Sequence, residues 1–166
     1  FQNNTAENLG GAMHLSSNSD LEATDMVVNN NSANRGGGIS ILNSVGDFVG
    51  GEINNNYAWK GGGIYSTGSD LDFFNGTLTQ NNSESYGGGL LSYSTNLVMD
   101  STNVTFNSSD SSSGGGIRCL NFDSTSTYDV VITNSFISRN NAYNSGAGAF
   151  FSTASDDSSG MDILIE

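Results

Sequence analysis

Acidic side chains are the most frequent groups in this 166-residue chain that could do chemistry. Seventeen Asp and Glu residues stand against four Lys and Arg residues, which gives a net charge of −13 at pH 7. The best local pair is Asp70 and Asp72, because an alternating strand would point both carboxylates to one face. We expect a larger set to line one edge of the molecule: Asp20, Asp47, Asp70, Asp129 and Asp162.

Three roles fit these acids, namely solvation of a sheet-rich surface, weak Ca²⁺ binding and paired catalytic carboxylates. The chain has no Asp-x-Asp-x-Asp-Gly loop, which is the local sequence that clusters oxygen ligands around calcium. We therefore expect the acids to serve mainly for solubility and charge repulsion.

The other reactive residue types are too isolated to predict a catalytic or metal centre. His14 is the only histidine and Cys119 the only cysteine, so neither a triad nor a cysteine-rich zinc site is supported. Cys119 repeats positions that hold Leu15 and Ile41 elsewhere, which favours a small buried residue. We predict no catalytic residue, no metal site and no cofactor, although Arg118 points outward and could meet acids on neighbouring strands.

Asn-x-Ser/Thr sequences predict several sites for N-linked glycans. A chain this rich in Asn, Ser and Thr also produces such sequences by chance. We exclude Asn81, because it belongs to a repeating Asn column, and keep five candidates: Asn3, Asn30, Asn75, Asn103 and Asn107.

Several aromatic residues lie near glycine-rich corners and are expected to be exposed: Tyr57, Trp59, Tyr65, Tyr86 and Tyr143. Such rings could stack on sugar rings or on adjacent subunits, and ordinary surface aromatics fit equally well.

Composition excludes several classes of protein. Three Arg and one Lys cannot neutralise a phosphate backbone, so nucleic-acid binding is not expected. The longest apolar stretches are a few residues, so no segment is predicted to span a membrane. Asn, Ser, Gly and Thr make up half of the chain, as in many disordered segments. Order therefore depends on where the hydrophobic residues, 35% of the chain, are placed.

Those hydrophobic residues follow an internal repeat marked by glycine triplets. Gly10-Gly11-Ala12 is followed by similar triplets that begin at Gly36, Gly61, Gly87, Gly114 and Gly146. The first five begin about 26 residues apart, and the last interval is longer, with its surplus near 121–128. After each triplet comes a short alternating segment typical of a half-buried strand, beginning for example at Ile39 and Ile64.

Upstream of each triplet, an apolar residue is followed three residues later by Asn. This column contains Asn4, Asn31, Asn56, Asn81 and Asn140. The fifth copy departs, because Phe106 is followed by Ser109. Stacked Asn side chains can hydrogen-bond to their copies above and below, so we predict a structural ladder.

Each copy therefore contains three short expected strands, and a period of this kind is one coil of a parallel β-helix. We predict an all-β solenoid of about six rungs, forming one domain over residues 1–166 and belonging to a longer rod. The absence of proline agrees, because every rung donates backbone N–H groups to its neighbour.

The motif of Phe or Ile, two residues, Asn, then Gly-Gly-Gly or Gly-Gly-Ala and an aliphatic residue resembles the repeats of chlamydial polymorphic outer-membrane proteins. More broadly, it is similar to right-handed parallel β-helix repeat proteins of cell surfaces. The resemblance covers nearly the whole chain, and it implies the fold and the handedness. It also implies a range of functions, from autotransported adhesins to polysaccharide lyases and hydrolases.

The leading functional prediction is a structural one, namely a secreted, glycosylated β-helical element of a surface fibre that stacks end to end with copies of itself. A surface adhesin or autotransporter-type passenger, which contacts a host or a glycan, is the first alternative. A polysaccharide lyase or hydrolase is the second, and a cluster of three or more acids with Arg118 in one groove would favour it.

Overall fold

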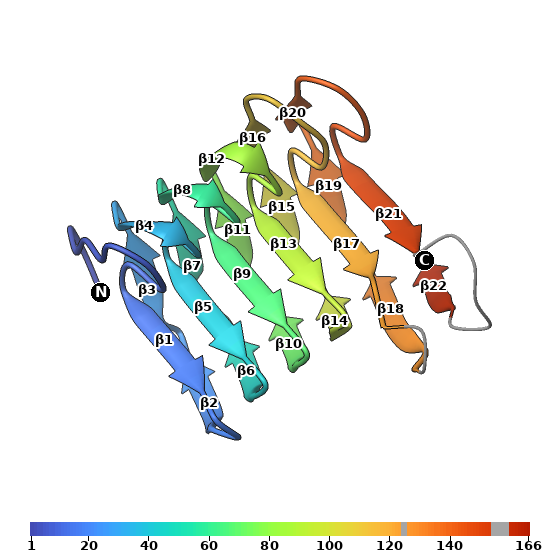
Figure 1. The fold of residues 1–166 in the computed structure, drawn as a ribbon, viewed down its shortest axis with the longest axis horizontal. Helices are drawn as coiled ribbons and strands as arrows, with labels where there is room; N and C mark the ends of the chain where they lie inside the picture. The colour runs from blue at the N-terminus through green and yellow to red at the C-terminus, as the bar shows by residue number, and fades with distance from the viewer. Residues whose placement is uncertain (124–125, 154–159) are drawn as a thin grey trace.

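The computed structural model describes residues 1–123, 126–153 and 160–166, and these residues form a parallel β-solenoid without helices. Strands follow one another around the molecule and each pairs with its counterpart in the next turn, so that the molecule grows along one axis (Figure 1). The all-β solenoid predicted from the repeat is thereby confirmed. Within the described residues, no helix is long and apolar enough to cross a bilayer.

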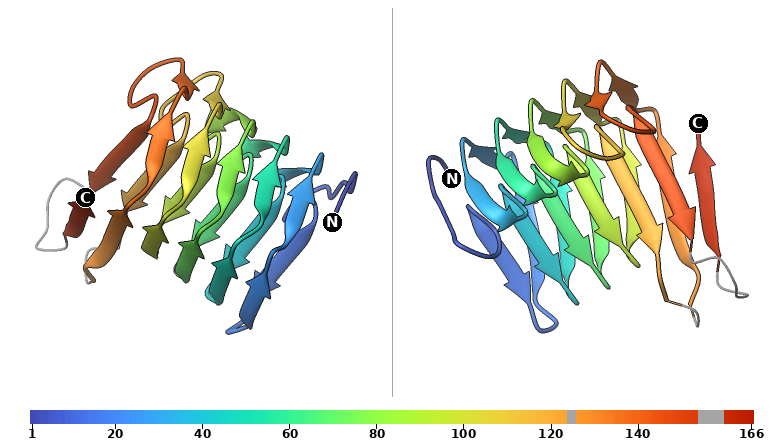
Figure 2. Two further views of the ribbon diagram at one scale, coloured as in Figure 1. Left: turned by 180° about the vertical axis from the view of Figure 1, so that it is seen from behind. Right: turned by 45° about the horizontal axis from the view of Figure 1, so that its top comes forward.

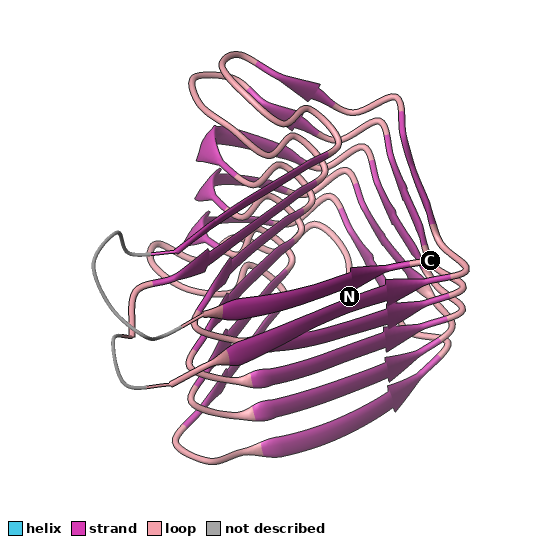
Figure 3. Ribbon diagram, turned by 90° about the vertical axis from the view of Figure 1, so that its right-hand side faces the viewer, coloured by secondary structure: helices cyan, strands magenta, loops and turns pink. Residues whose placement is uncertain are grey.

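Four parallel sheets run along the axis, and the view along it shows their strands surrounding a common interior (Figure 3). Sheet 1 contains β1 (Met13–Ser16), β5 (Ile39–Leu42), β9 (Ile64–Thr67), β13 (Leu90–Tyr93), β17 (Ile117–Asn121) and β21 (Ala149–Thr153). Sheet 2 contains β2 (Asp20–Thr24), β6 (Val45–Val49), β10 (Asp70–Phe74), β14 (Asn96–Asp100), β18 (Tyr128–Thr133) and β22 (Met161–Ile165).

The other two sheets contain five short strands each. Figure 2 shows the molecule from behind on the left and with its top brought forward on the right. Sheet 3 contains β3 (Val27–Asn29), β7 (Glu52–Asn54), β11 (Thr77–Thr79), β15 (Asn103–Thr105) and β19 (Phe136–Ser138). Sheet 4 contains β4 (Ser32–Arg35), β8 (Tyr57–Lys60), β12 (Asn82–Tyr86), β16 (Ser108–Ser109) and β20 (Asn141–Ala142). The number of complete turns is therefore smaller than the six predicted.

Sheet 4 corrects the prediction of three strands per turn. Its strands pair in register through a column of small residues, namely Ala33, Ala58, Ser83, Ser109 and Ala142. Ala58, Ser83 and Ser109 are fully buried, so this column faces the interior. Alternation between small and polar residues gives no hydrophobic period, and these segments therefore resemble turns in the sequence.

The interior is filled by aliphatic and aromatic columns from sheets 1, 2 and 3. Ile39, Ile64 and Leu90 occupy one column in sheet 1. Phe48 and Phe73 are neighbours in a column of sheet 2, and their rings meet edge to face with centroids 6.2 Å apart. All five side chains are at most 2% exposed. Each fully buried side chain of this kind stabilises the fold by about 1.5–3 kcal/mol, which offsets the ordering of a chain rich in Gly and Ser.

Residues with positive φ form the corners between sheets. The residue before the ladder Asn has a φ of 57° at Asn3, 54° at Asn30 and 52° at Asn55, angles that Asn tolerates well. Gly61 occupies another corner with a φ of 65°, and a Cβ atom there would lie 2.5 Å from the carbonyl oxygen of Ile64. The glycine at this corner is therefore a backbone requirement of the coil, whereas the corner before the ladder is also occupied by Gln80, Phe106 and Arg139 at similar φ values.

The longer last repeat carries its surplus in the connection between β17 and β18, as the spacing predicts. This connection runs from 122 to 127, and residues 124–125 within it lie outside the described residues. The corresponding connections of three earlier turns, such as that between Leu42 and Val45, contain two residues.

Candidate functional site

The outer face of sheet 1 carries a second hydrophobic cluster, separate from the interior. Tyr65, Leu91 and Leu120 are buried there, with exposed fractions of 7%, 0% and 4%. Tyr65, Leu91 and Arg118 are consecutive members of one outward column. The prediction that Tyr65 is exposed is therefore wrong, because side chains from neighbouring turns and from the end of sheet 4 cover it.

Sheet 4 supplies part of this cover through the residues that immediately precede the glycine triplets. Arg35 pairs with Lys60, and Lys60 pairs with Tyr86, so the three stack in register. The Arg35 guanidinium lies 5.8 Å from the centroid of the Tyr65 ring. The Lys60 ammonium lies 4.4 Å from the centroid of Trp59 and 5.2 Å from that of Tyr86.

Arg118 also forms cation–π contacts with aromatic rings of this cluster. Its guanidinium carbon lies 4.2 Å from the centroid of Tyr86 and 4.8 Å from that of Phe150. Its Nη1 donates a hydrogen bond to the Ser112 hydroxyl at 3.1 Å, whereas its buried Nε has no hydrogen-bond partner. Burial lowers the pKa of the Arg118 guanidinium, although nearby Tyr93 and Tyr86 act in the opposite direction. Arginine remains charged at neutral pH despite such a shift.

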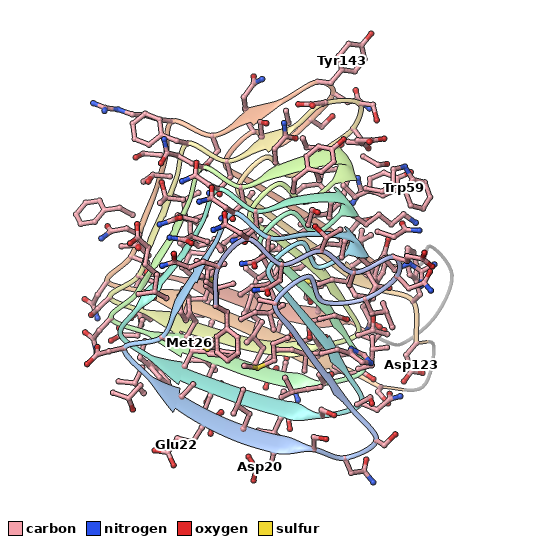
Figure 4. The ribbon with its side chains drawn as sticks, turned by 90° about the vertical axis from the view of Figure 1, so that its left-hand side faces the viewer. Asp20, Glu22, Met26, Trp59, Asp123 and Tyr143 are labelled. Carbon is pink, nitrogen blue, oxygen red and sulfur yellow. The ribbon has the colours of Figure 1, made fainter. Side chains whose placement is uncertain are left out.

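A groove of about 460 Å³ opens over this cluster, and its walls combine aromatic rings with cations. It is lined by Arg35, Lys60, Tyr65, Thr67, Tyr93, Ser94, Phe122 and Asp123. Tyr93 stacks on Phe122 with centroids 5.6 Å apart and meets Tyr65 edge-on at 5.9 Å. Burial raises the pKa of the Tyr93 phenol, and Tyr65 adds to this rise. Figure 4 shows Trp59 and Asp123 on this side of the molecule.

Residues that are far apart in the sequence, and that we expected to be unrelated, meet in and beside this groove. Tyr65, Tyr86 and Trp59 were expected as unconnected surface aromatics, and the basic residues as members of different turns. A usable signal exists in the sequence, because Arg35, Lys60 and Tyr86 each stand directly before a glycine triplet in consecutive copies. In the outward column of sheet 1, Tyr65, Leu91 and Phe150 are also aromatic or apolar where the strand alternation should place polar residues.

Acidic residues gather on a different face, the outside of sheet 2. Asp20, Asp70, Asp129 and Asp162 share one column with Val45 and Asn96 between them. Asp47 lies in a second column, directly opposite Glu22 and Asp72, so the predicted edge contains two acidic columns. Figure 4 shows Asp20 and Glu22 pointing away from the body of the molecule.

Burial and neighbouring charges raise the pKa of two of these acids, Asp47 and Asp72. Burial raises the pKa of Asp47, and the charges of Asp20, Glu22 and Asp70 raise it further. Burial likewise raises the pKa of Asp72, together with the charges of Asp47 and Asp70. Among the described residues, no group of three or more His, Cys, Asp or Glu side chains is arranged to hold a metal ion.

The two lone reactive residues occupy different environments. His14 is exposed on β1, at the outward position of sheet 1. Cys119 is fully buried beside Ser92 in the column that also holds Leu15 and Ile41. Burial raises the pKa of the Cys119 thiol to about 12. A protonated, inaccessible thiol is a poor nucleophile, so Cys119 serves as a packing residue.

The Asn column forms a continuous hydrogen-bonded ladder. In each step the side-chain Oδ1 of one Asn accepts bonds from the backbone N–H and the Nδ2 of the Asn in the preceding turn, at 2.8–3.1 Å. The structure places all five predicted members in this ladder: Asn4, Asn31, Asn56, Asn81 and Asn140. Their Nδ2 groups also reach backbone carbonyls, as Asn81 does to Ile53 at 2.9 Å.

A sixth member corrects two predictions at once. Asn107 connects Asn81 to Asn140 and is fully buried, so the ladder is not interrupted in the fifth copy. The apolar residue of that copy is Val104, which pairs with Leu78, whereas Phe106 is 52% exposed at a corner. Asn107 is therefore withdrawn as a glycosylation candidate, because its amide is enclosed and fully hydrogen-bonded.

The other four sequon residues lie on the surface. Asn3, Asn30 and Asn75 are exposed at positive-φ corners, with φ values of 57°, 54° and 55°. Asn103 is exposed on β15, in register with Thr77 and Phe136. These four amides are accessible to modification, whereas Asn81 is 1% exposed.

Comparisons with family models, with curated proteins and with solved structures find no match for this chain.

Proposed function

We propose that this chain is a rigid structural element of an extracellular surface or fibre. The observation that carries the proposal is the uninterrupted Asn ladder, which joins successive turns through buried side-chain amides alongside four backbone ladders. A rod in which every turn is hydrogen-bonded to the next resists extension and bending along its axis. We also propose that the repeats are related to those of chlamydial polymorphic outer-membrane proteins and that the coil is right-handed, as that resemblance implies.

Location and assembly can be tested by immunogold electron microscopy of intact cells that produce the protein. An antibody against this chain is expected to label extracellular fibres or the cell surface without permeabilisation. Labelling only after permeabilisation would contradict the extracellular role. Label spread evenly over the surface, with no filament beneath it, would contradict the fibre and the end-to-end stacking of copies.

A second candidate function is a surface binding domain of the adhesin type, and the groove on sheet 1 favours it. Tyr93 and Phe122 form a stacked pair in its wall, and Phe122 is 59% exposed. Exposed aromatic rings in a concave site are typical of contacts with carbohydrate or protein ligands. The acid cluster that would favour a lyase is not seen beside Arg118 among the described residues.

Substitution of one ring tests this second function. Phe122→Ala is expected to abolish binding of the labelled protein to a carbohydrate array, because it removes half of the stacked pair. Phe136→Ala is the matched control, since Phe136 is 71% exposed on sheet 3 and lies outside the groove. Equal binding by the two variants, or no binding by the unmodified protein, would contradict the adhesin-type function.

A further inference from the structure

The charge of the groove is opposite to that of the molecule. Net charge is −13, yet three of the four Lys and Arg residues of the chain, Arg35, Lys60 and Arg118, gather in and beside this groove. They come from three different turns and two different sheets, so sequence proximity does not explain their meeting. Arg35 and Lys60 line the groove, while Arg118 lies beside it over Tyr86, the ring that also contacts Lys60. The fourth cation, Arg139, instead contacts the ring of Phe106 at 5.3 Å.

Aromatic rings, and not carboxylates, are the side chains that contact these three cations. Within the described part of the chain, Arg35, Lys60 and Arg118 form cation–π contacts and no ion pair with any of the many acids. Arg118 in addition keeps a buried Nε without an acceptor. Cation–π contacts orient a guanidinium while leaving its N–H groups available to an anion.

The geometry also sets the shape of a matching ligand. Arg35, Lys60 and Tyr86 occupy the same register position in three successive turns, and parallel strands lie about 4.8 Å apart. A linear ligand laid along the axis therefore meets a cation or a ring at each turn. The faces of Tyr93 and Phe122 form an apolar wall beside this row.

We propose that the groove binds an acidic carbohydrate chain, with Arg35 and Lys60 contacting its carboxylate or sulfate groups and the aromatic wall contacting its sugar rings. Flat rings match the apolar faces of sugars, and cations that contact rings and form no ion pair within the described residues match the acidic groups. The inference rests on the second candidate function, because it names the ligand class of the same groove.

Three hexasaccharides that share the chondroitin backbone separate the contributions of ligand charge and of sugar–aromatic contact to the binding affinity. The first is unsulfated chondroitin, which has a carboxylate on alternate sugars, the second is chondroitin sulfate, and the third is carboxyl-reduced, neutral chondroitin. Binding is measured by isothermal titration calorimetry at low and moderate salt. We expect both acidic probes to bind at least tenfold more tightly than the neutral one, and their affinity to fall as salt rises. Comparison of the two acidic probes shows which anionic group is preferred.

Charge-neutralising variants locate the contact. Lys60→Gln and Arg35→Gln are each expected to weaken binding of the acidic probes about tenfold or more, because each removes a charge-assisted hydrogen bond from the groove lining. Arg139→Gln removes the same charge outside the groove and is expected to change affinity by less than about twofold. Thermal unfolding of each variant verifies the fold, and Lys60→Gln provides an independent reading if Arg35→Gln proves unstable.

The possible outcomes distinguish this inference from the binding function on which it rests. Equal affinity for the neutral and acidic probes overturns the acidic ligand class, while a carbohydrate-binding domain remains supported. Tight binding of the acidic probes that is unchanged in Lys60→Gln and Arg35→Gln overturns the assignment to this groove. No binding of any probe overturns both.

Discussion

At the scale of single residues, the Asn ladder is the feature in which side-chain chemistry most directly determines the fold. Asn is the residue whose amide can both accept from the previous turn and donate to the next, as Asn81 does with Asn56 and Asn107. The positive-φ corner belongs to the residue before each ladder Asn, such as Asn30 before Asn31.

Removing one ladder amide is expected to be costly. In Asn81→Ala, the backbone N–H of Asn56 and the carbonyl of Ile53 lose their buried partners. Because an unsatisfied buried group costs about 1–3 kcal/mol, we expect the free energy of unfolding to fall by about 3 kcal/mol in urea titrations. Asn103→Ala, on an exposed strand position, is the control and is expected to change stability by less than about 0.5 kcal/mol. Equal losses in the two variants would show that the ladder does not hold the turns together.

Glycosylation can also be predicted residue by residue. Exposed sequons at Asn75 and Asn103 are expected to carry glycans in protein purified from its native source, whereas Asn81 and Asn107 are not. A glycan on either ladder Asn would exclude its side chain from the interior. Peptide mass spectrometry measures all of these sites in one digest. Unmodified Asn75 and Asn103 would contradict the glycoprotein proposal, and modified Asn107 would contradict the ladder.

The sequence predicted single residues correctly where every copy of the repeat has the same residue type at a position. It misled where two neighbouring residues could each be the apolar residue that precedes the ladder Asn. Asn107 was displaced from the ladder because Phe106, like Val104, is apolar and could begin the motif. Burial decides between them, since Val104 is fully buried and Phe106 is half exposed. The groove was missed because its rings and cations meet only after the chain has coiled, although each cation is visible in the sequence.

At the scale of strands and sheets, prediction followed the strength of the hydrophobic period. Sheets 1, 2 and 3 were identified because columns such as Ile39 and Ile64 alternate with polar residues. Sheet 4 was not identified, because Ala58 and Ser83 fill its interior column and leave no apolar signal. A strand with a small interior column is recognised only by its position in the coil.

The acidic columns of sheet 2 give a prediction at this scale. Glu22, Asp47 and Asp72 lie directly opposite one another on consecutive strands. Because burial and neighbouring charges raise the pKa of Asp47, its contribution to stability is present below the ordinary carboxyl pKa and is lost as pH rises through the raised value. At pH 7, Asp47→Asn is therefore expected to stabilise the protein by up to about 1 kcal/mol, the magnitude of a cross-strand like-charge pair.

Thermal unfolding at two pH values measures this effect. The rise in Tm for Asp47→Asn is expected at pH 7 and should disappear at pH 3, where the native carboxyl is already protonated. Glu7→Gln removes one charge from an exposed position outside the columns and serves as the control. An equal gain at both pH values, or an equal gain in Glu7→Gln, would show that repulsion within the column is not the cause.

At the scale of the whole molecule, charge and architecture oppose each other. Four parallel sheets place carboxylates of successive turns about one strand spacing apart, so a net charge of −13 is concentrated along a rod. Composition predicted solubility from this charge, but only the coil shows that the acids and the cations occupy different faces.

Self-repulsion of this kind should make stability increase with salt. The distance over which charges interact falls from about 30 Å at 0.01 M to about 3 Å at 1 M salt, which leaves neighbouring carboxylates screened. Since about 1 kcal/mol corresponds to about 2–4 °C in a domain of this size, we expect NaCl to raise Tm at pH 7 by several degrees. Differential scanning calorimetry measures the rise, and the same titration at pH 3 is the control. With the carboxylates protonated the increase should largely disappear, because only four Lys and Arg side chains and His14 remain to repel one another, against seventeen acids at pH 7. A Tm that is independent of salt at pH 7, or that rises equally at both pH values, would mean that packing and the ladder set the stability of the rod without opposition from its charge.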